Sequence, residues 1–221
     1  MNLMLILIPT ALILLSQFYI NSTYKKYSMV DIKSKYSGKD VTQKILEKNN
    51  IKNVKIKKIS GALTDHFNPK TGEINLSEDI YNDSSIASVA VAAHECGHVI
   101  QHKEKYFFII LRSMLVPIVN ISSKLGYIIL IIGFLSSVLD LALIGLILMC
   151  FALLFQLVTL PTEFNASKRA IDELLSLNII TNQEKPMVKK MLLSAALTYV
   201  ASFFANILEM LRLFLVIRNN D

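Results

Sequence analysis

An almost unbroken apolar stretch from Leu125 to Leu160 constrains the fold of this chain more than any other feature. A helix rises 1.5 Å per residue, so one helix over this stretch would measure about 54 Å, whereas the hydrocarbon core of a bilayer is about 30 Å thick. The stretch is too long for one crossing, and two crossings fit barely. Ser136-Ser137 and Asp140 interrupt the run. We predict a transmembrane hairpin over residues 122–160 that turns there, with one long helix as the alternative.

Two further apolar segments lie near the ends of the chain. Leu3 to Ile20 is long enough to cross a bilayer and lacks the basic start and small-residue cleavage site of a signal peptide. We therefore expect residues 1–20 to be a retained anchor. Met191 to Ile217 carries Glu209 and Arg212, so it could span the membrane or lie at its interface. The sequence thus predicts a mainly α membrane protein with three or four transmembrane helices.

Composition supports this class, with 53% hydrophobic residues, a mean hydropathy of +0.48 and a net charge of +6. Residues 24–60 hold eleven lysines against three acidic residues, directly behind the first apolar segment. Cytoplasmic loops favour Lys and Arg near the ends of spans, so we expect this side to be cytoplasmic. The lysines are scattered and no nucleic-acid-binding motif accompanies them. Nucleic acid is therefore not an expected partner.

The largest polar region covers residues 21–118. An amphipathic pattern predicts a short helix that ends near Asn49, and alternating apolar residues predict strands at 54–59 and 74–76. These strands indicate a small β-sheet. A helix from about Ser85 to Gln101 follows, and its first turns are small and apolar, as a buried helix requires.

The motif His94-Glu-Cys-Gly-His98 lies on the later turns of that helix. Positions i and i+4 share one face, so the two histidines can offer their imidazoles to one zinc ion. Glu95 would then lie beside the open coordination position, where it can take a proton from zinc-bound water. Gly97 leaves room beside the metal, and Cys96 points away from the histidines and is assigned to packing. Two histidines on an exposed helix are the alternative, but burying all three polar side chains without a metal would be costly.

A catalytic zinc usually has three protein ligands, and the candidates for the third are His102, His66 and Glu163. His102 lies about 12 Å along the helix from His94, too far for three side chains of one straight helix to converge on an ion. His66 lies in a loop that could fold back. Glu163 can reach the histidines only if the hairpin returns the chain to the side it left. Its alternative role is an acid that favours the dipole of a helix first turn.

Four ordered blocks of the sequence resemble the YugP-like family of membrane neutral zinc metallopeptidases: Gly61–Pro69, Ala92–Gln101, Leu160–Ala170 and Ala195–Ala201. The resemblance covers most of the chain. It implies a gluzincin-like zinc peptidase domain with one zinc ion and Glu163 as its third ligand.

A more distant similarity is to membrane peptidases in which HExxH is followed by an ExxAD-type helix. Ser167 stands where those enzymes have Asp. A serine can hydrogen-bond to a ligand imidazole there but carries no charge.

Together these features predict a zinc-dependent, membrane-embedded endopeptidase with Glu95 as general base and with its catalytic face in the cytoplasm. Tyr199 and His66 are candidates for the oxyanion donor, with core packing as the other role of Tyr199. An extended substrate could pair with the strand at 73–76 by strand addition. The expected partners are a protein or peptide substrate, membrane proteins included, and the lipid bilayer of the cell membrane.

A non-catalytic zinc-binding membrane chaperone or assembly factor is the main alternative, although a structural site has no need of a general base. A metal transporter is a further alternative, but it would need charged residues inside the spans. Asp140 lies at the expected turn instead, so the sequence does not favour a transporter. The expected organisation is an anchor (1–20), a catalytic region with the HExxH helix (21–118), a hairpin (122–160), a third-ligand helix region (161–190) and an apolar C-terminal helix and tail (191–221).

Overall fold

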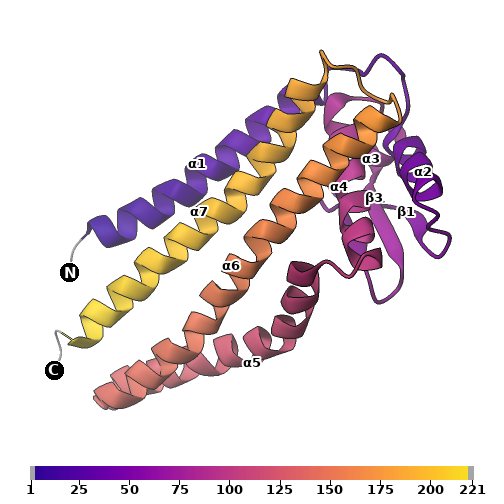
Figure 1. The fold of residues 1–221 in the computed structure, drawn as a ribbon. Coiled ribbons are helices and arrows are strands. Elements are labelled where there is room, and N and C mark those ends of the chain that lie inside the picture. Colours follow the sequence, from indigo (N-terminus) through magenta and orange to yellow (C-terminus); the bar gives the residue numbers. More distant parts are fainter. Residues whose placement is uncertain (1–2, 219–221) are drawn as a thin grey trace. The chain divides into compact units, whose positions relative to one another are not determined.

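The computed structural model describes residues 3–218 (Figure 1). These residues divide into two compact units. Residues 18–106 and 162–196 form the first, which we call the sheet unit because it holds the β-strands. Residues 107–161 form the second together with the chain ends up to residue 17 and from residue 197, and we call it the apolar unit. Three helices, α1, α6 and α7, pass from one unit into the other.

Four helices are long and apolar enough to cross a membrane within the part of the chain that the structure describes: α1 (Met4–Tyr27), α5 (Phe107–Leu135), α6 (Leu139–Ser176) and α7 (Lys185–Arg218). Helix α7 meets this criterion although it carries Glu209 and Arg212, whose side chains form an ion pair with each other. Pairing lowers the cost of placing charges in an apolar helix. The prediction of a mainly α membrane protein with a small sheet is confirmed.

The hairpin between α5 and α6 turns where the sequence predicted, so a single helix over residues 125–160 is excluded. Ser137 in the turn adopts a left-handed backbone conformation with φ of 56°. The two helices approach closely at glycines: a Cβ atom on Gly133 would lie 2.4 Å from the backbone nitrogen of Ala142, and one on Gly126 would lie 2.8 Å from the carbonyl oxygen of Gly145.

Both helices of the hairpin extend further than the sequence indicated. α5 begins at Phe107 and contains Pro117, and α6 continues through Pro161 to Ser176. The breaks expected near residues 118 and 160 are therefore not helix ends. Proline removes one backbone hydrogen bond, but membrane helices tolerate it where neighbouring groups satisfy the freed carbonyl.

The sheet unit contains three short strands in the order β1-β3-β2. β1 (Lys55–Ile59) pairs in parallel with β3 (Glu73–Ser77), and β2 (His66–Asn68) pairs antiparallel with β3 on its other side. The sequence did not predict β2. Because β3 is central, both of its edges are occupied, and the expectation that a substrate adds to the strand at 73–76 is wrong. The unpaired edge of the sheet next to the helix that carries the HExxH motif belongs to β2.

Helix α4 (Ile86–Lys103) carries the HExxH motif and is the most buried helix of the sheet unit. Ser85 caps it by accepting a hydrogen bond from the backbone of Ser88, which satisfies one of the free N–H groups of the first turn. Small residues such as Ala90 and Ala93 are fully buried, and the helix packs against α2 (Gly38–Lys48) and α3 (Glu78–Asn82). An exposed helix, the alternative context for this motif, is thereby excluded.

Candidate metal centre

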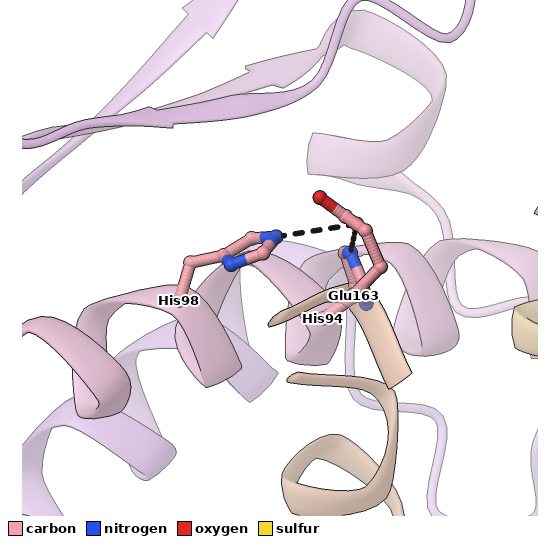
Figure 2. A group of neighbouring side chains, drawn as sticks. All are labelled: His94, His98 and Glu163. Atoms are coloured by element: carbon pink, nitrogen blue, oxygen red, sulfur yellow. Dashed lines mark hydrogen bonds and ion pairs between the residues drawn. The ribbon is translucent and has the colours of Figure 1, made fainter. Parts of the chain in front are cut away.

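His94, His98 and Glu163 bring three potential ligand atoms together within 4.8 Å of one another in the sheet unit (Figure 2). The carboxylate oxygen Oε2 of Glu163 lies 3.2 Å from Nε2 of His94 and 3.6 Å from Nε2 of His98. The Glu163 side chain is only 4% exposed. The alternative role of Glu163 as an acid in a helix first turn does not apply, because this residue lies in the later half of α6.

The distances between these three atoms suit a zinc ion. Ligand atoms that bind one tetrahedral zinc at about 2.0–2.1 Å lie about 3.4 Å from each other, close to the observed 3.2 and 3.6 Å. Two imidazoles and one carboxylate are also a ligand set of catalytic zinc sites. The residues present therefore fit this metal.

Close packing of α4 on α6 brings the carboxylate to the histidines. A Cβ atom on Gly97 would lie 2.5 Å from the carbonyl oxygen of Ala166, well inside contact distance. Glycine at position 97 thus lets the two backbones touch one turn away from Glu163. We expected this glycine to leave room beside the metal; the space that it leaves is filled by α6.

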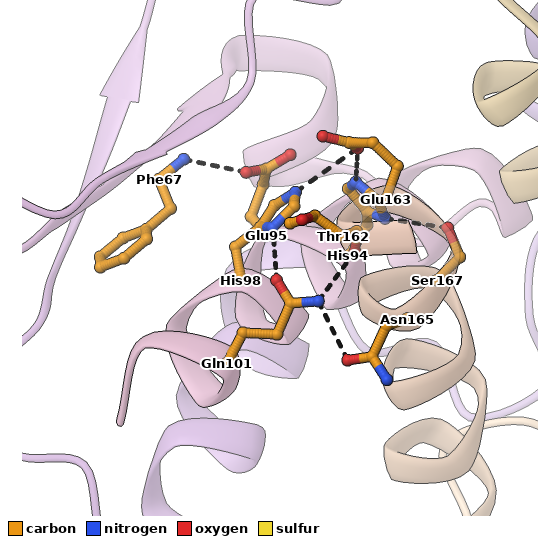
Figure 3. Close-up of polar contacts among 9 residues, drawn as sticks. All are labelled: Phe67, His94, Glu95, His98, Gln101, Thr162, Glu163, Asn165 and Ser167. Carbon is orange, nitrogen blue, oxygen red and sulfur yellow. Dashed lines mark hydrogen bonds and ion pairs between the residues drawn. The ribbon is translucent and has the colours of Figure 1, made fainter. Parts of the chain in front are cut away.

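Gln101 fixes the orientation of His98, a role that the sequence analysis did not predict (Figure 3). Its Nε2 donates to the carbonyl oxygen of Thr162 at 2.8 Å and to Oδ1 of Asn165 at 3.0 Å. Since a backbone carbonyl can only accept, the other end of the amide must be the oxygen, and this Oε1 faces Nδ1 of His98 at 3.0 Å. His98 therefore carries its proton on Nδ1 when neutral, which leaves the Nε2 lone pair for a metal.

Ser167 supports the other imidazole. Its hydroxyl lies 3.2 Å from Nδ1 of His94, at the position where ExxAD-type enzymes have Asp. The contact is the one that we expected a serine to make there. Both histidines are thus held by uncharged groups, Ser167 and Gln101.

Glu95 lies beside the three ligand atoms but is not one of them. It is 7% exposed, and its Oε2 accepts a hydrogen bond of 2.9 Å from the backbone N–H of Phe67 (Figure 3). This N–H belongs to the edge strand β2. The carboxylate therefore faces the free edge of the sheet.

The charges of the centre act on one another. Burial disfavours the charged form of His98, but its hydrogen bond to Glu163 and the negative charges of Glu163 and Glu95 outweigh this effect and raise the pKa of His98 above its usual range. The carboxylates of Glu163 and Glu95 thus favour positive charge at this centre.

The remaining sequence candidates lie outside the cluster found in residues 3–218. His66 contacts the carbonyl oxygen of Thr64 and the side chain of Asn75 through its two ring nitrogens. The ring of His102 packs edge-on against Phe67.

Cys96 and Tyr199 also lie outside this cluster. Cys96 is fully buried, its Sγ lies 3.9 Å from the carbonyl oxygen of Thr42, and burial raises the pKa of its thiol. Tyr199 lies on α7 in the apolar unit and is 40% exposed. Its role as an oxyanion donor stays a prediction.

Known proteins that are similar to this chain identify its family. The family model described as "Putative neutral zinc metallopeptidase" matches residues 2–218. The protein of Bacillus subtilis (strain 168) called "Putative membrane protease YugP" is 39% identical over 204 residues, which cover 92% of this chain and 91% of that protein. No solved structure matches. The chain therefore belongs to the family described as putative neutral zinc metallopeptidases.

Proposed function

We propose that this protein is a membrane-embedded endopeptidase that uses one zinc ion, held by His94, His98 and Glu163. The observation that carries the proposal is the convergence of these ligand atoms within 4.8 Å, next to a carboxylate that is not needed as a ligand. A purely structural zinc site has four closed positions, whereas a catalytic site keeps one open. Three ligands plus Glu95 match the catalytic arrangement.

Zinc, when bound, supplies a Lewis acid that makes a water molecule easier to deprotonate and polarises the scissile carbonyl. Glu95 accepts the proton of the attacking water and later delivers it to the leaving amine. The burial of Glu95, at 7% exposure, keeps bulk water away from this transfer. His66 and Tyr199 are proposed as donors to the oxyanion, and His66 neighbours Phe67 on β2.

We propose that the substrate backbone binds along the edge of β2 that is not paired with β3. The Phe67 N–H points away from β3 and toward Glu95, as its hydrogen bond shows. An extended peptide that lies along this edge can form main-chain hydrogen bonds while its carbonyl faces the zinc ligands. We infer a preference for unfolded or extended segments of protein substrates.

The proposed location of this chemistry is the cytoplasmic side of the cell membrane. Residues 24–60 carry eleven lysines against three acidic residues, and this excess favours the cytoplasm. All of these residues belong to the sheet unit, which also holds the three proposed ligands.

Hydrolysis of casein by the purified, zinc-loaded full-length protein tests the proposal when compared with Glu95→Gln. Gln keeps the shape of Glu95 but cannot accept the proton, so we expect activity to fall by about 100-fold or more with zinc content still near one per chain. Glu47→Gln, an exposed change on α2, is the matched control and should keep activity. A wild-type protein that binds zinc tightly but cleaves nothing would favour the non-catalytic alternative.

A further inference from the structure

A groove of about 290 Å³ lies between α6 and α7 within the sheet unit. Its lining is mostly apolar and includes Ile171, Leu192 and Ala196. Phe164 and Leu193 also line it, and they are 43% and 41% exposed. The groove thus presents an apolar surface that the described chain does not cover.

Three lysines line the same groove: Lys168, Lys185 and Lys189. Asp172 is the one acidic residue in the lining, so the groove carries an excess of positive charge. All three lysines are exposed, and none of them has an ion-pair partner within residues 3–218. Their charges are available to an anionic ligand.

The order of these residues along the helices separates the apolar end from the basic end. Phe164 follows Pro161, the last residue of α6 in the apolar unit, by three positions, and Leu193 precedes Leu197, the first residue of α7 in that unit, by four. Lys168 lies about 6 Å further along α6 than Phe164, and Lys189 lies about 6 Å further along α7 than Leu193. The exposed apolar residues therefore adjoin the candidate spans, and the lysines lie one turn beyond them.

We propose that this groove binds one anionic phospholipid, with an acyl chain on Phe164 and Leu193 and the phosphate between Lys168 and Lys189. A phospholipid has the same sequence of chemistry as the groove, apolar and then anionic, starting from the membrane side. Lysine side chains bury their stems on apolar surface while their ammonium groups reach a headgroup, and basic pockets between membrane helices bind anionic headgroups.

Other occupants match the groove less well. A free phosphate would use the lysines but leave the apolar floor uncovered, and Asp172 would oppose it. An acidic peptide would need partners for its backbone, which a mostly apolar lining does not supply. The proposal does not depend on zinc or on hydrolysis. Its one link to the metal centre is Ser167, which lines the groove and also contacts His94.

The test measures lipid binding by the full-length protein in nonionic detergent, using native mass spectrometry with phosphatidylglycerol and phosphatidylcholine of identical chains. We expect phosphatidylglycerol to bind more tightly. Lys168→Gln/Lys189→Gln should weaken it by about 25-fold, since each lysine near an anionic headgroup contributes about fivefold. Phosphatidylcholine binding should change much less.

Lys52→Gln/Lys70→Gln is the matched control, because it removes the same charge from two exposed lysines outside the groove. It should leave phosphatidylglycerol binding within about twofold of wild type. Leu193→Gln should weaken both lipids. Equal affinity for the two lipids, or equal losses in the two lysine pairs, would overturn the proposal. If inorganic phosphate or an acidic peptide at the same concentration displaced all of the phosphatidylglycerol, that competitor and not a lipid would be the ligand of the groove.

Discussion

Gln101 and His98 form a directional pair: the Oε1 atom of Gln101 accepts from Nδ1 of His98 at 3.0 Å, and the rest of the amide is held by α6. One buried side chain thus connects the second proposed ligand with Thr162, the residue before the third. Partners of this kind fix the tautomer and the ring orientation of a ligand histidine.

Replacing Gln101 should separate these two roles. Gln101→Leu removes both contacts, and we expect zinc affinity to fall by about 10- to 100-fold, together with thermal stability. Gln101→Glu keeps an acceptor for His98 but faces the Thr162 carbonyl with an oxygen, so it should largely keep zinc affinity while losing stability. Chelator competition and thermal unfolding of the metal-free protein measure the two effects. Equal zinc affinities of the two variants would show that the acceptor at Nδ1 has no role.

Glu163→Ala should reduce zinc affinity by more than about 100-fold, beyond the loss typical of a residue that only supports a ligand. The variant removes the one carboxylate within the ligand cluster of the described chain. Glu173→Gln, on the same helix but in an ion pair with Lys48, should leave zinc binding unchanged. Competition with a fluorescent chelator measures both. If Glu163→Ala binds zinc as well as wild type, His66 becomes the next candidate.

Gly97→Ala should destabilise the protein and weaken the metal centre at once. The new Cβ would lie 2.5 Å from the Ala166 carbonyl oxygen, so α6 must move, at a cost of about 1–3 kcal/mol. The sign of the effect is diagnostic, because alanine stabilises an unconstrained helix position by up to about 1 kcal/mol relative to glycine. Thermal unfolding that shows a more stable variant would contradict the close contact of the two helices.

The proposed cytoplasmic location of the sheet unit can be tested by labelling single cysteines on intact cells. In a Cys96→Ala/Cys150→Ala background, Ser136→Cys in the hairpin turn should react with an impermeant maleimide. Lys70→Cys, exposed in the sheet unit, should react only after the cells are permeabilised. The reverse pattern would place the sheet unit outside the cell and change the class of expected substrates. The cysteine-free background protein is the control and should not react under either condition.

The sequence was informative where chemistry depends on local geometry. His94 and His98 share a face because of helix periodicity alone, and the turn at Ser136-Ser137 followed from length. Glu163 lies far away in sequence, so its candidacy needed an argument about topology and a family resemblance. Glu163 could be named in advance because the apolar stretch is long enough for two crossings, and two crossings return the chain to the side on which the histidines lie.

Helix ends and supporting contacts could not be predicted in the same way. The expected bounds at residues 118 and 160 lie next to Pro117 and Pro161, but both helices continue through these prolines. A strand of three residues such as β2 has too short a pattern to detect. Gln101 was a polar residue three positions after His98, which places it on the same face, but its partners on α6 depend on packing that no local pattern encodes.

The sheet unit is discontinuous in the chain, since residues 18–106 and 162–196 form it on either side of the hairpin. The ribosome therefore makes both histidines and Glu95 first, the hairpin next, and Glu163 last. A nascent chain that ends within the hairpin has the two imidazoles of the zinc site but lacks the Glu163 carboxylate that would complete it. The order of synthesis would thus withhold the proposed peptidase activity from chains that end before Glu163, so that a chain able to cleave its neighbours arises only after the hairpin of α5 and α6 has been made.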